Sequence, residues 1–481
     1  MSMQSQARHK IEVYTVKKNI TKPHVTTNFQ EIIMSAMIYP TSNFADQDKL
    51  CFERAKGVYI YDVDNKQYLD GMSGLWCTAL GYGNEELINA ISEQLHKLSF
   101  SHLFGGKSHS PGVALANKLA AMVPIKDARV FFGNSGSDAN DSHYKMLRYY
   151  FNAIGKPQKR KIITRERAYH GVTVASGALT SLPVNTMHFD APLEALGILR
   201  TDSPHYFSSH LQGESETQFV NRIVSNLETL IIRETPNTIA AMIIEPMTGA
   251  SGVIVPPDGY YEKLQAVLNK YDILIWADEV ITGFGRTGND FGCTTMGIKP
   301  DLMTFAKQLS SAYYPISAAV IPGYMHDAMV EQSAASGVFG HGYTYSGHPV
   351  GCAAALKTLE IFEREHLFEK AAAAGIYLHQ QLSKFNDHRL VGEIRGKGLL
   401  AAIELVPNKQ KDDRFIGGKV GSFAQFACQK HGLIVRAVAG NSIALCPPLI
   451  ITHSQIDEII QTLAKSLDET LAYAQDEGLL T

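Results

Sequence analysis

The sequence lacks the features of a disulfide-linked, zinc-binding or membrane-spanning protein. Its 481 residues include only six cysteines, and no two of them form a CxxC pair. Scattered thiols of this kind indicate neither a disulfide framework nor a zinc site, so we expect reduced cysteines in a reducing compartment. No run of the sequence approaches the roughly 20 apolar residues that a membrane helix needs. We therefore expect no membrane partner.

Neither sign of charge dominates. Lys plus Arg number 44 and Asp plus Glu number 47, which gives a formal net charge of −3. A protein that neutralises many nucleic-acid phosphates usually carries a basic surplus, so we expect no nucleic-acid partner. Hydrophobic residues at 45% and charged residues at 19% are typical of a globular protein with a sizeable core.

The first thirty or so residues are polar and basic and lack the apolar segment of a secretory signal. A transit peptide has little support, because Arg8 is the only arginine in this stretch. We therefore expect an N-terminal arm over residues 1–40 and a cytoplasmic protein.

Short apolar runs alternate with helical patterns through the middle of the chain. The runs at 129–132, 240–244 and 273–276 have the pattern of buried strands, and the stretches between such runs carry apolar residues at helical spacing. This alternation predicts an α/β fold, with a mostly parallel sheet covered by helices on both faces. Ligands of such folds collect at the strand ends.

The two ends of the chain differ from this middle part. A short meander is expected at about 50–80, and strand runs mixed with helices follow Pro349. We therefore expect a second, α+β domain made from both chain ends. The predicted division is an arm over 1–40, the first part of the small domain over 41–95, a large cofactor-binding domain over 96–345 and the rest of the small domain over 346–481.

Two patterns that suggest different kinds of site are better interpreted as structural. Residues 283–288 read GFGRTG, which matches the GxGxxG motif of dinucleotide-binding folds. No amphipathic helix follows and no acidic residue lies about 20 positions on, so we predict a tight structural loop. No HExxH motif occurs, and His341 and His348 lie in a glycine-rich loop, so no metal site is predicted.

Three polar features follow apolar strands of the middle region. NSGSDAN (134–140) joins a strand to a helix start, where free N–H groups and the helix dipole favour a phosphate. A plain N-cap accounts for the same residues equally well. Asp278 ends a buried strand, where a carboxylate is costly unless it meets a cation, either in a structural ion pair or in a ligand. Lys307 follows the next strand, where a lysine is costly unless it is paired or used covalently as a neutral amine.

A phosphate loop, an acid and a lysine at strand ends of one parallel sheet are the groups that pyridoxal 5′-phosphate (PLP) requires. The loop binds the phosphate, the acid binds the pyridine nitrogen and the lysine binds the aldehyde. The sequence therefore predicts a PLP site.

From about residue 45 to its end, the chain resembles the class III aminotransferases of PLP fold type I. Eight blocks carry the resemblance in the right order: GMSGLW (71–76), NSGSDAN (134–140), YHG (169–171), EPMTGASGVIVPP (245–257), WADEVITGFGRTG (276–288), PDLMTFAKQLSS (300–311), GYTYSGHPVGCAA (342–354) and IVRAV (434–438). Within the class it is most similar to the amine:pyruvate or ω-amino acid:pyruvate branch. Ile281 and Arg436 point to this branch, because ornithine-type members usually carry Gln at the position of Ile281.

The resemblance implies a large domain with a mostly parallel seven-stranded sheet between helices, and a small α+β domain. It implies that Lys307 carries PLP as a Schiff base and moves the substrate proton, while Asp278 binds the pyridine nitrogen. The other implied cofactor contacts are Gly136 and Ser137 at the phosphate, Tyr169 and Val280 on the two ring faces, and Thr344 at the phosphate of the neighbouring subunit. The implied substrate contacts are Trp76, Tyr169, Ala250, Arg436, and Phe104 of the partner subunit.

Three of these residues would also suit a purely structural role. Trp76 and Tyr169 would serve as core aromatics, and Arg436 as a surface ion-pair residue. If Arg436 binds substrate, its fork suits a planar carboxylate and its length lets it swing away from an amine without one. Glu245 is interpreted as a buried supporting acid. Two departures from the branch, Gln308 after the lysine and the glycine pair at 105–106, bear on loop geometry and pocket size.

The implied activity is the transfer of an amino group from a primary amine or ω-amino acid to pyruvate, through ping-pong half-reactions on one cofactor. The implied assembly is a homodimer with sites at the interface, with a tetramer left open. One alternative is an aminomutase of the same class, against which Arg436 argues. The other is a non-catalytic PLP-fold interaction protein, against which Lys307, Asp278 and the phosphate loop argue together.

Overall fold

The computed structural model describes residues 36–44, 50–409 and 414–481, in two compact units, Met1–Phe52 and Glu53–Thr481. In the first unit, residues 36–44 form turns and bends without a helix or strand, and the hydroxyl of Ser42 donates to the carbonyl oxygen of Tyr39. Most of the predicted arm over 1–40 lies outside the described residues. The proposed division of the chain at 40, 95 and 345 stays a prediction.

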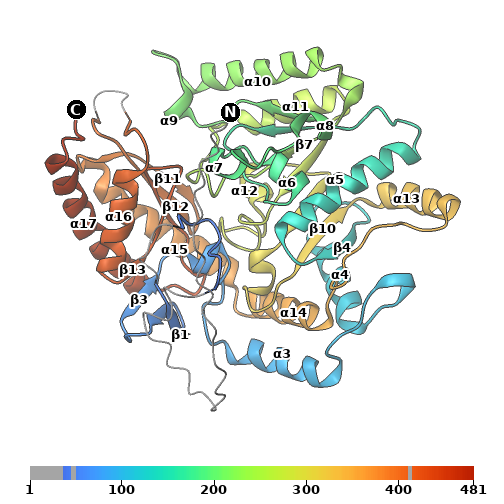
Figure 1. The fold of residues 1–481 in the computed structure, drawn as a ribbon, viewed down its shortest axis with the longest axis horizontal. Coiled ribbons are helices and arrows are strands. Elements are labelled where there is room, and N and C mark those ends of the chain that lie inside the picture. Colours follow the sequence, from blue (N-terminus) through green and yellow to red (C-terminus); the bar gives the residue numbers. More distant parts are fainter. Residues whose placement is uncertain (1–35, 45–49, 410–413) are drawn as a thin grey trace, which may run out of the picture. The chain divides into compact units, whose positions relative to one another are not determined.

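A seven-stranded sheet lies at the centre of the second unit (Figure 1). β10 is antiparallel to both of its neighbours, and the remaining pairs are parallel. This confirms the predicted α/β fold with a mostly parallel sheet. The strand order is β4 (Arg129–Gly133), β10 (Ser317–Ile321), β9 (Leu302–Phe305), β8 (Leu274–Asp278), β7 (Ile239–Ile244), β5 (Lys161–Arg165) and β6 (Ile198–Thr201).

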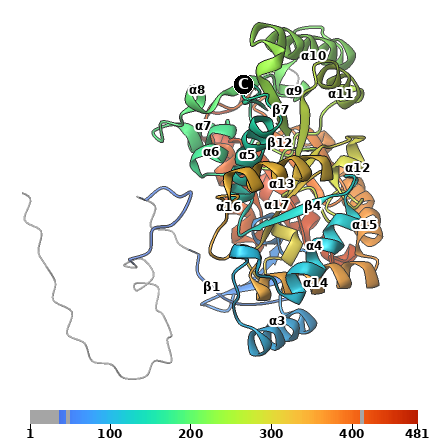
Figure 2. The ribbon, with the colours of Figure 1, turned by 90° about the vertical axis from the view of Figure 1, so that its right-hand side faces the viewer.

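Helices bury both faces of this sheet, which is why its strands are almost continuously apolar. The covering helices are α4 (Ser110–Met122), α5 (Gly136–Ala153), α10 (Glu216–Arg233), α11 (Tyr260–Lys270), α13 (Gly323–Ser336) and α14 (Pro349–Arg364). Trp276 of β8 shares a core cluster with Phe151 of α5, whereas its neighbour Ile275 shares the other cluster with Leu264 of α11. Figures 1 and 2 accordingly show α10 beside α11, and α5 beside α13.

Two four-stranded sheets form a smaller part of the second unit. β13 pairs in parallel with β3, so a strand near the C-terminus completes a sheet that begins near residue 52. This confirms the expected second domain built from both chain ends. The sheets are β1 (Phe52–Lys56), β2 (Tyr59–Asp62), β3 (Gln67–Asp70) and β13 (Leu433–Ile434), and β11 (Val391–Lys397), β12 (Leu400–Leu405), β15 (Ser442–Leu445) and β14 (Arg436–Val438).

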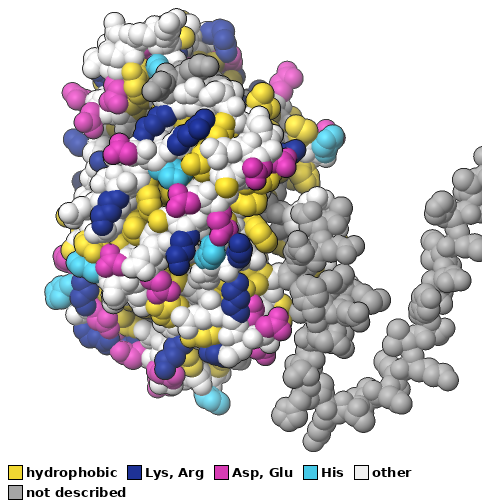
Figure 3. All heavy atoms as spheres, turned by 90° about the vertical axis from the view of Figure 1, so that its left-hand side faces the viewer, with side chains coloured by type: hydrophobic (Ala, Val, Ile, Leu, Met, Phe, Trp, Pro, Cys, Tyr) yellow, Lys and Arg dark blue, Asp and Glu magenta, His cyan; other side chains and the backbone are white. Residues whose placement is uncertain are grey.

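The other helices vary widely in length. They are α2 (Ser73–Trp76), α3 (Glu85–Lys97), α6 (Val174–Leu179), α7 (Pro183–Thr186), α8 (Leu193–Leu196), α9 (Tyr206–Ser209), α12 (Gly292–Met296), α15 (Leu367–Leu382), α16 (Lys419–Lys430), α17 (His453–Asp476), and the 3-10 turns η1 (Phe104–Gly106), η2 (Pro236–Thr238), η3 (Lys307–Ser310) and η4 (Ser383–Asp387). Within the described ranges, none of them combines the length and apolar character of a membrane span. On the face seen in Figure 3, basic and acidic side chains are interspersed.

The GFGRTG segment is a structural loop, as interpreted from the sequence. Arg286 is fully buried, and its guanidinium donates to the carbonyl oxygens of Leu399 (3.2 Å) and Pro447 (2.5 Å). Gly285 has a φ of 86°, and a Cβ at that position would collide with the ring of Phe368. Glycine is therefore required there by both conformation and space.

Candidate active site

A cavity of about 350 Å³ lies at the carboxyl ends of the strands of the seven-stranded sheet. Parallel strands present their carboxyl ends at one edge of a sheet, so residues far apart in the sequence meet there. Six of the predicted site residues line this cavity: Gly136, Ser137, Tyr169, Asp278, Val280 and Lys307.

Lys307 begins η3, and only Ala306 separates it from the end of β9. Its φ of 46° lies in the left-handed region, which residues with a side chain rarely adopt. Burial lowers the pKa of its amine, although nearby Cys77, Asp278 and Glu245 oppose this shift. A lowered pKa favours the neutral amine, which is the form that can act as a nucleophile.

Asp278 is the last residue of β8 and is only 5% exposed. Its Oδ2 accepts hydrogen bonds from Nδ1 of His170 (2.8 Å) and Nδ2 of Asn140 (2.9 Å). Its Oδ1 accepts from the backbone N–H of Val280 at 3.1 Å. These bonds compensate for the burial of a carboxylate and fix its orientation at the cavity wall.

The first turn of α5 serves both as a capped helix start and as a source of free donors. The hydroxyl of Ser135 accepts from the N–H of Asp138, whose carboxylate accepts from the N–H groups of Asn134 and Ser135. Among the described residues, no acceptor takes the N–H groups of Gly136 and Ser137. The plain N-cap is therefore present, and two donors at the positive end of the helix dipole remain for an anion.

Two glycines allow other groups to approach this turn closely. A Cβ at Gly136 would lie 3.1 Å from Cγ2 of Val280, and a Cβ at Gly171 would lie 2.5 Å from the hydroxyl oxygen of Ser137. Gly171 also has a φ of 132°, outside the range of most residues. The YHG block and the phosphate-loop block therefore pack directly against each other.

Tyr169 is half-buried, and its backbone N–H donates to Oε1 of Glu245 at 3.1 Å. Glu245 also accepts from the N–H of Gly249, and burial raises the pKa of its carboxyl group. Arg436 does not line the cavity, but its charge acts on Tyr169 and partly offsets the rise that burial causes in the pKa of that phenol. Burial lowers the pKa of Arg436 itself.

Two predicted substrate contacts do not line the cavity. Trp76 is 1% exposed and shares a core cluster with Met247 and Ile281, both of which line the cavity. Ala250 follows Met247 on the same loop and does not line the cavity. Their contact with substrate stays a prediction.

Phe104 and Thr344 lie on neighbouring surface loops. Phe104 is 49% exposed and Thr344 is also exposed. A Cβ at Gly342 would lie 3.3 Å from the ring of Phe104, which places the two loops in contact. Neither residue lines the cavity of its own chain. Their assignment to the site of a partner subunit stays a prediction.

Sequence reasoning missed several cavity residues, among them Cys77, Asn140 and His170. Asn140 lies four residues after Gly136, so helical spacing could have placed the two on one face of α5. His170 belongs to the YHG block, but no local pattern shows that its ring points at Asp278. Gln308, noted as a departure, donates from Nε2 to the carbonyl oxygens of Ile281 (3.1 Å) and Gly283 (2.8 Å).

The residues of this cavity fit PLP. Two free N–H groups at a helix start suit its phosphate, a buried and oriented carboxylate suits its protonated ring nitrogen, and an amine with a lowered pKa suits its aldehyde.

Comparisons with known proteins agree with this assignment. A family model described as "Aminotransferase class-III" matches residues 42–467. A probable γ-aminobutyrate transaminase 3, mitochondrial, of Oryza sativa subsp. indica is 46% identical over 427 residues, covering 88% of this chain and 83% of that protein. The ω-transaminase of Pseudomonas jessenii in complex with PMP matches with a TM-score of 0.90 and 47% identity, over 92% of this chain and 98% of that one. A transaminase with L-Ala matches with a TM-score of 0.86 and 46% identity, over 88% and 100%.

Proposed function

This chain belongs to the class-III aminotransferases, which use pyridoxal 5′-phosphate, and we propose that it transfers an amino group from a primary amine or ω-amino acid to pyruvate. The observation that carries the proposal is the distribution of positive charge. Among the described residues that line the cavity, Lys307 is the only lysine or arginine, and the charge of Arg436 acts on Tyr169 in its wall. One guanidinium suits a keto acid with a single carboxylate.

The apolar part of the cavity wall supports the same acceptor. Met247, Val280 and Ile281 line it, and a second carboxylate placed against them would lose its hydration without gaining a partner. A dicarboxylic keto acid should therefore bind less well than pyruvate. The chain's similarity to a γ-aminobutyrate transaminase and to an ω-transaminase supports an amino donor whose amine lies away from its carboxylate.

The chain's own groups have distinct tasks in this proposal. When bound, PLP supplies the electron sink that receives the electron pair of the substrate Cα–H bond. Asp278 holds the proton on the ring nitrogen, and His170 and Asn140 keep its carboxylate in place. Nζ of Lys307 would move a proton from the substrate Cα to C4′ of the cofactor in one half-reaction, and from C4′ to Cα of the product in the other. The first turn of α5 binds the phosphate.

We propose a homodimer in which Phe104 and Thr344 reach the site of the partner subunit. Their exposure and the contact between their loops, together with their absence from the cavity of their own chain, support this arrangement. We also propose a cytoplasmic location, because Arg8 is the only arginine in the first 35 residues. A relative is named as mitochondrial, so the location should be tested. Finding the protein in an organelle with a shortened N-terminus would contradict a cytoplasmic location.

A matrix of donors and acceptors tests the activity. γ-Aminobutyrate, a shorter ω-amino acid and an aralkylamine without a carboxylate are each incubated with pyruvate or with 2-oxoglutarate, with Lys307→Ala as the background. We expect alanine from pyruvate with all three donors and little glutamate from 2-oxoglutarate. If glutamate formed faster than alanine, pyruvate would not be the preferred acceptor. If no donor and acceptor pair gave a product, the proposed transaminase activity would be wrong.

A further inference from the structure

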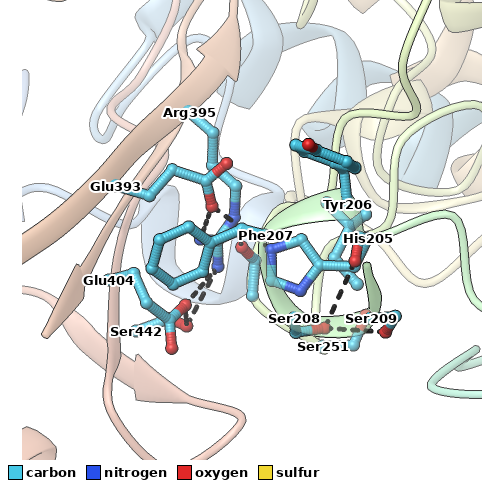
Figure 4. A network of polar contacts seen from close by, with 12 residues as sticks. His205, Tyr206, Phe207, Ser208, Ser209, Ser251, Glu393, Arg395, Glu404 and Ser442 are labelled. Atoms are coloured by element: carbon cyan, nitrogen blue, oxygen red, sulfur yellow. Dashed lines mark hydrogen bonds and ion pairs between the residues drawn. The ribbon is translucent and has the colours of Figure 1, made fainter. Parts of the chain in front are cut away.

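A ring of polar side chains outside the cavity holds the loop that forms one of its walls. This loop, residues 245–257, connects β7 to α11, and Glu245 and Met247 at its start line the cavity. Figure 4 shows Glu393 and Arg395 on one side facing His205 on the other. The four side chains of the ring, here called the clamp, are Arg167, His205, Glu393 and Arg395.

The first half of the clamp comes from the segments that follow β5 and precede α9. Nη2 of Arg167 donates to the carbonyl oxygen of Ser251 in the loop at 3.0 Å. Nη1 of Arg167 donates to Nδ1 of His205 (2.9 Å) and to the hydroxyl of Ser208 (3.0 Å). His205 is 3% exposed, so this contact is removed from solvent.

The second half comes from β11 and closes the ring. Nε2 of His205 lies 3.2 Å from Oε2 of Glu393, and the same oxygen accepts from Nη1 of Arg395 at 2.6 Å. Nε of Arg395 donates to the carbonyl oxygen of Gly252 at 2.7 Å. The ring therefore begins and ends on two successive carbonyl groups of the loop.

The hydrogen-bonding roles in the clamp are determined by its chemistry. An arginine can only donate, so Nδ1 of His205 is the acceptor and its hydrogen lies on Nε2, which donates to Glu393. Burial lowers the pKa of His205, and Glu393 opposes this shift. The charges of Arg167 and Arg395 are balanced by Glu393 and by Glu404, which accepts from Nη2 of Arg395 at 2.7 Å.

The loop is shaped to receive this arginine. Gly252 has a φ of 110°, and a Cβ there would lie 2.8 Å from Nη2 of Arg395 and 2.9 Å from the hydroxyl oxygen of Ser442. A side chain at Gly252 would therefore push the guanidinium away from the loop. Close approach of the clamp requires glycine at this point.

The clamp also connects the loop to the strands that carry Arg436. Nη2 of Arg395 donates to the hydroxyl of Ser442 in β15 at 3.0 Å. β15 pairs with β14, in which Arg436 lies opposite Ala444. The loop and the sheet that contains Arg436 are therefore held to one buried guanidinium.

We propose that the clamp positions the substrate pocket: it holds the 245–257 loop against the sheet of Arg436 and so sets the space for the carboxylate end of a substrate. This inference rests on the proposed transamination. None of the four clamp residues lines the cavity, so they are positioning residues that act through the loop. Loosening the clamp should weaken substrate binding, while the chemistry at Lys307 stays unchanged.

Three variants of the holoenzyme test the clamp. Glu393→Gln removes the charge between His205 and Arg395. His205→Leu removes the two hydrogen bonds that His205 makes, to Arg167 and Glu393, and His205→Gln keeps one donor and one acceptor. Loss of one or two such bonds should raise KM for pyruvate and for γ-aminobutyrate about five- to tenfold in the first two variants. His205→Gln should recover most of this loss. The value of kcat and the visible absorbance of the bound cofactor should stay close to wild type.

The matched control is Glu214→Gln, which breaks the pair between Glu214 and Arg222 (2.7 and 2.8 Å) at the start of α10. It should lower the melting temperature without changing KM. An equal rise of KM in the control, an unchanged KM in Glu393→Gln, or a fall in kcat alone would overturn the inference. If His205→Leu does not fold, Glu393→Gln and His205→Gln decide the outcome. If the wild-type enzyme transfers no amino group, the proposed function fails; if it does and the clamp variants match the control, only this inference fails.

Discussion

Oδ2 of Asp278 and Nδ1 of His170 form a buried pair at 2.8 Å. A carboxylate oxygen can only accept, so the ring nitrogen carries the hydrogen and its position is fixed by the acid. Asn140 donates to the same oxygen at 2.9 Å, and its amide also donates to the carbonyl oxygen of His170 at 2.7 Å. The acid that we assign to the cofactor nitrogen is thus held by neighbours from two other segments.

Asp278→Asn should reduce the amine half-reaction by about 10²–10⁴-fold, because removing one partner of a buried ion pair costs about 3–5 kcal/mol. The measurement is single-turnover absorbance of the bound cofactor after mixing with the amine. Glu279→Gln is the matched control, since Glu279 is an equally buried neighbour that accepts from the N–H groups of Gly292 and Cys293. It should lose stability while keeping its rate. A near-normal rate in Asp278→Asn would refute the assigned role.

Lys307 should react with PLP at a lower pH than an ordinary lysine. Burial holds its pKa below the usual 10.5, and only the neutral amine attacks an aldehyde. The rate of covalent PLP uptake by the apoprotein should therefore rise with pH and level off below pH 10.5. Stopped-flow absorbance gives this profile, and Lys307→Ala gives the background. An inflection at or above 10.5, or borohydride trapping on another lysine, would contradict the assignment.

The same shift affects the stability of the apoprotein. In the pH window between the lowered pKa of Lys307 and 10.5, the unfolded chain binds a proton that the folded chain does not. The cost of burying Lys307 is therefore greatest below its folded pKa and disappears as pH rises through this window. Lys307→Met should be more stable than wild-type apoprotein at neutral pH, and this difference should shrink toward pH 10.5. Urea unfolding at several pH values measures it.

Arg436→Ala should raise KM for pyruvate about ten- to a hundredfold, because a hydrogen bond to a charged group contributes roughly 1.5–3 kcal/mol. The half-reaction of an amine without a carboxylate should change much less. Arg364→Ala is the control, since Arg364 binds Glu86 at the exposed surface. Equal losses in both half-reactions would mean that Arg436 is a structural residue.

Thr344 should bind the phosphate of the partner subunit, and hybrid dimers can test this directly. Thr344→Ala alone should release PLP more readily, while Lys307→Ala alone should be inactive. A hybrid of the two chains contains one site with both residues intact, provided that Thr344 acts across the interface. That hybrid should regain half of the wild-type activity and normal PLP retention. Activity with weak retention would show that Thr344 acts within its own chain.

The order of the catalytic groups was determined by the sequence alone. Gly136, Asp278 and Lys307 each lie at or shortly after the end of a short apolar strand, and parallel strands bring such positions to one edge of a sheet. A charged side chain is costly at the end of a buried strand unless it has a partner, and this made Asp278 and Lys307 recognisable. The block of Gly136 was recognised by the free N–H groups of a helix start, which favour a phosphate. The alternation of strands and helices similarly predicted the sheet that holds them.

Only the tertiary structure decided which side chains support these groups. His170 reaches Asp278 across 108 residues and His205 reaches Glu393 across 188, and no local spacing encodes contacts of that range. The tertiary structure also kept Trp76 out of the cavity lining, because Trp76 shares a core cluster with residues of strands from the other end of the chain, such as Leu400 and Ala444. Local patterns reflect the burial of one segment, whereas the geometry of a site depends on how several segments pack together.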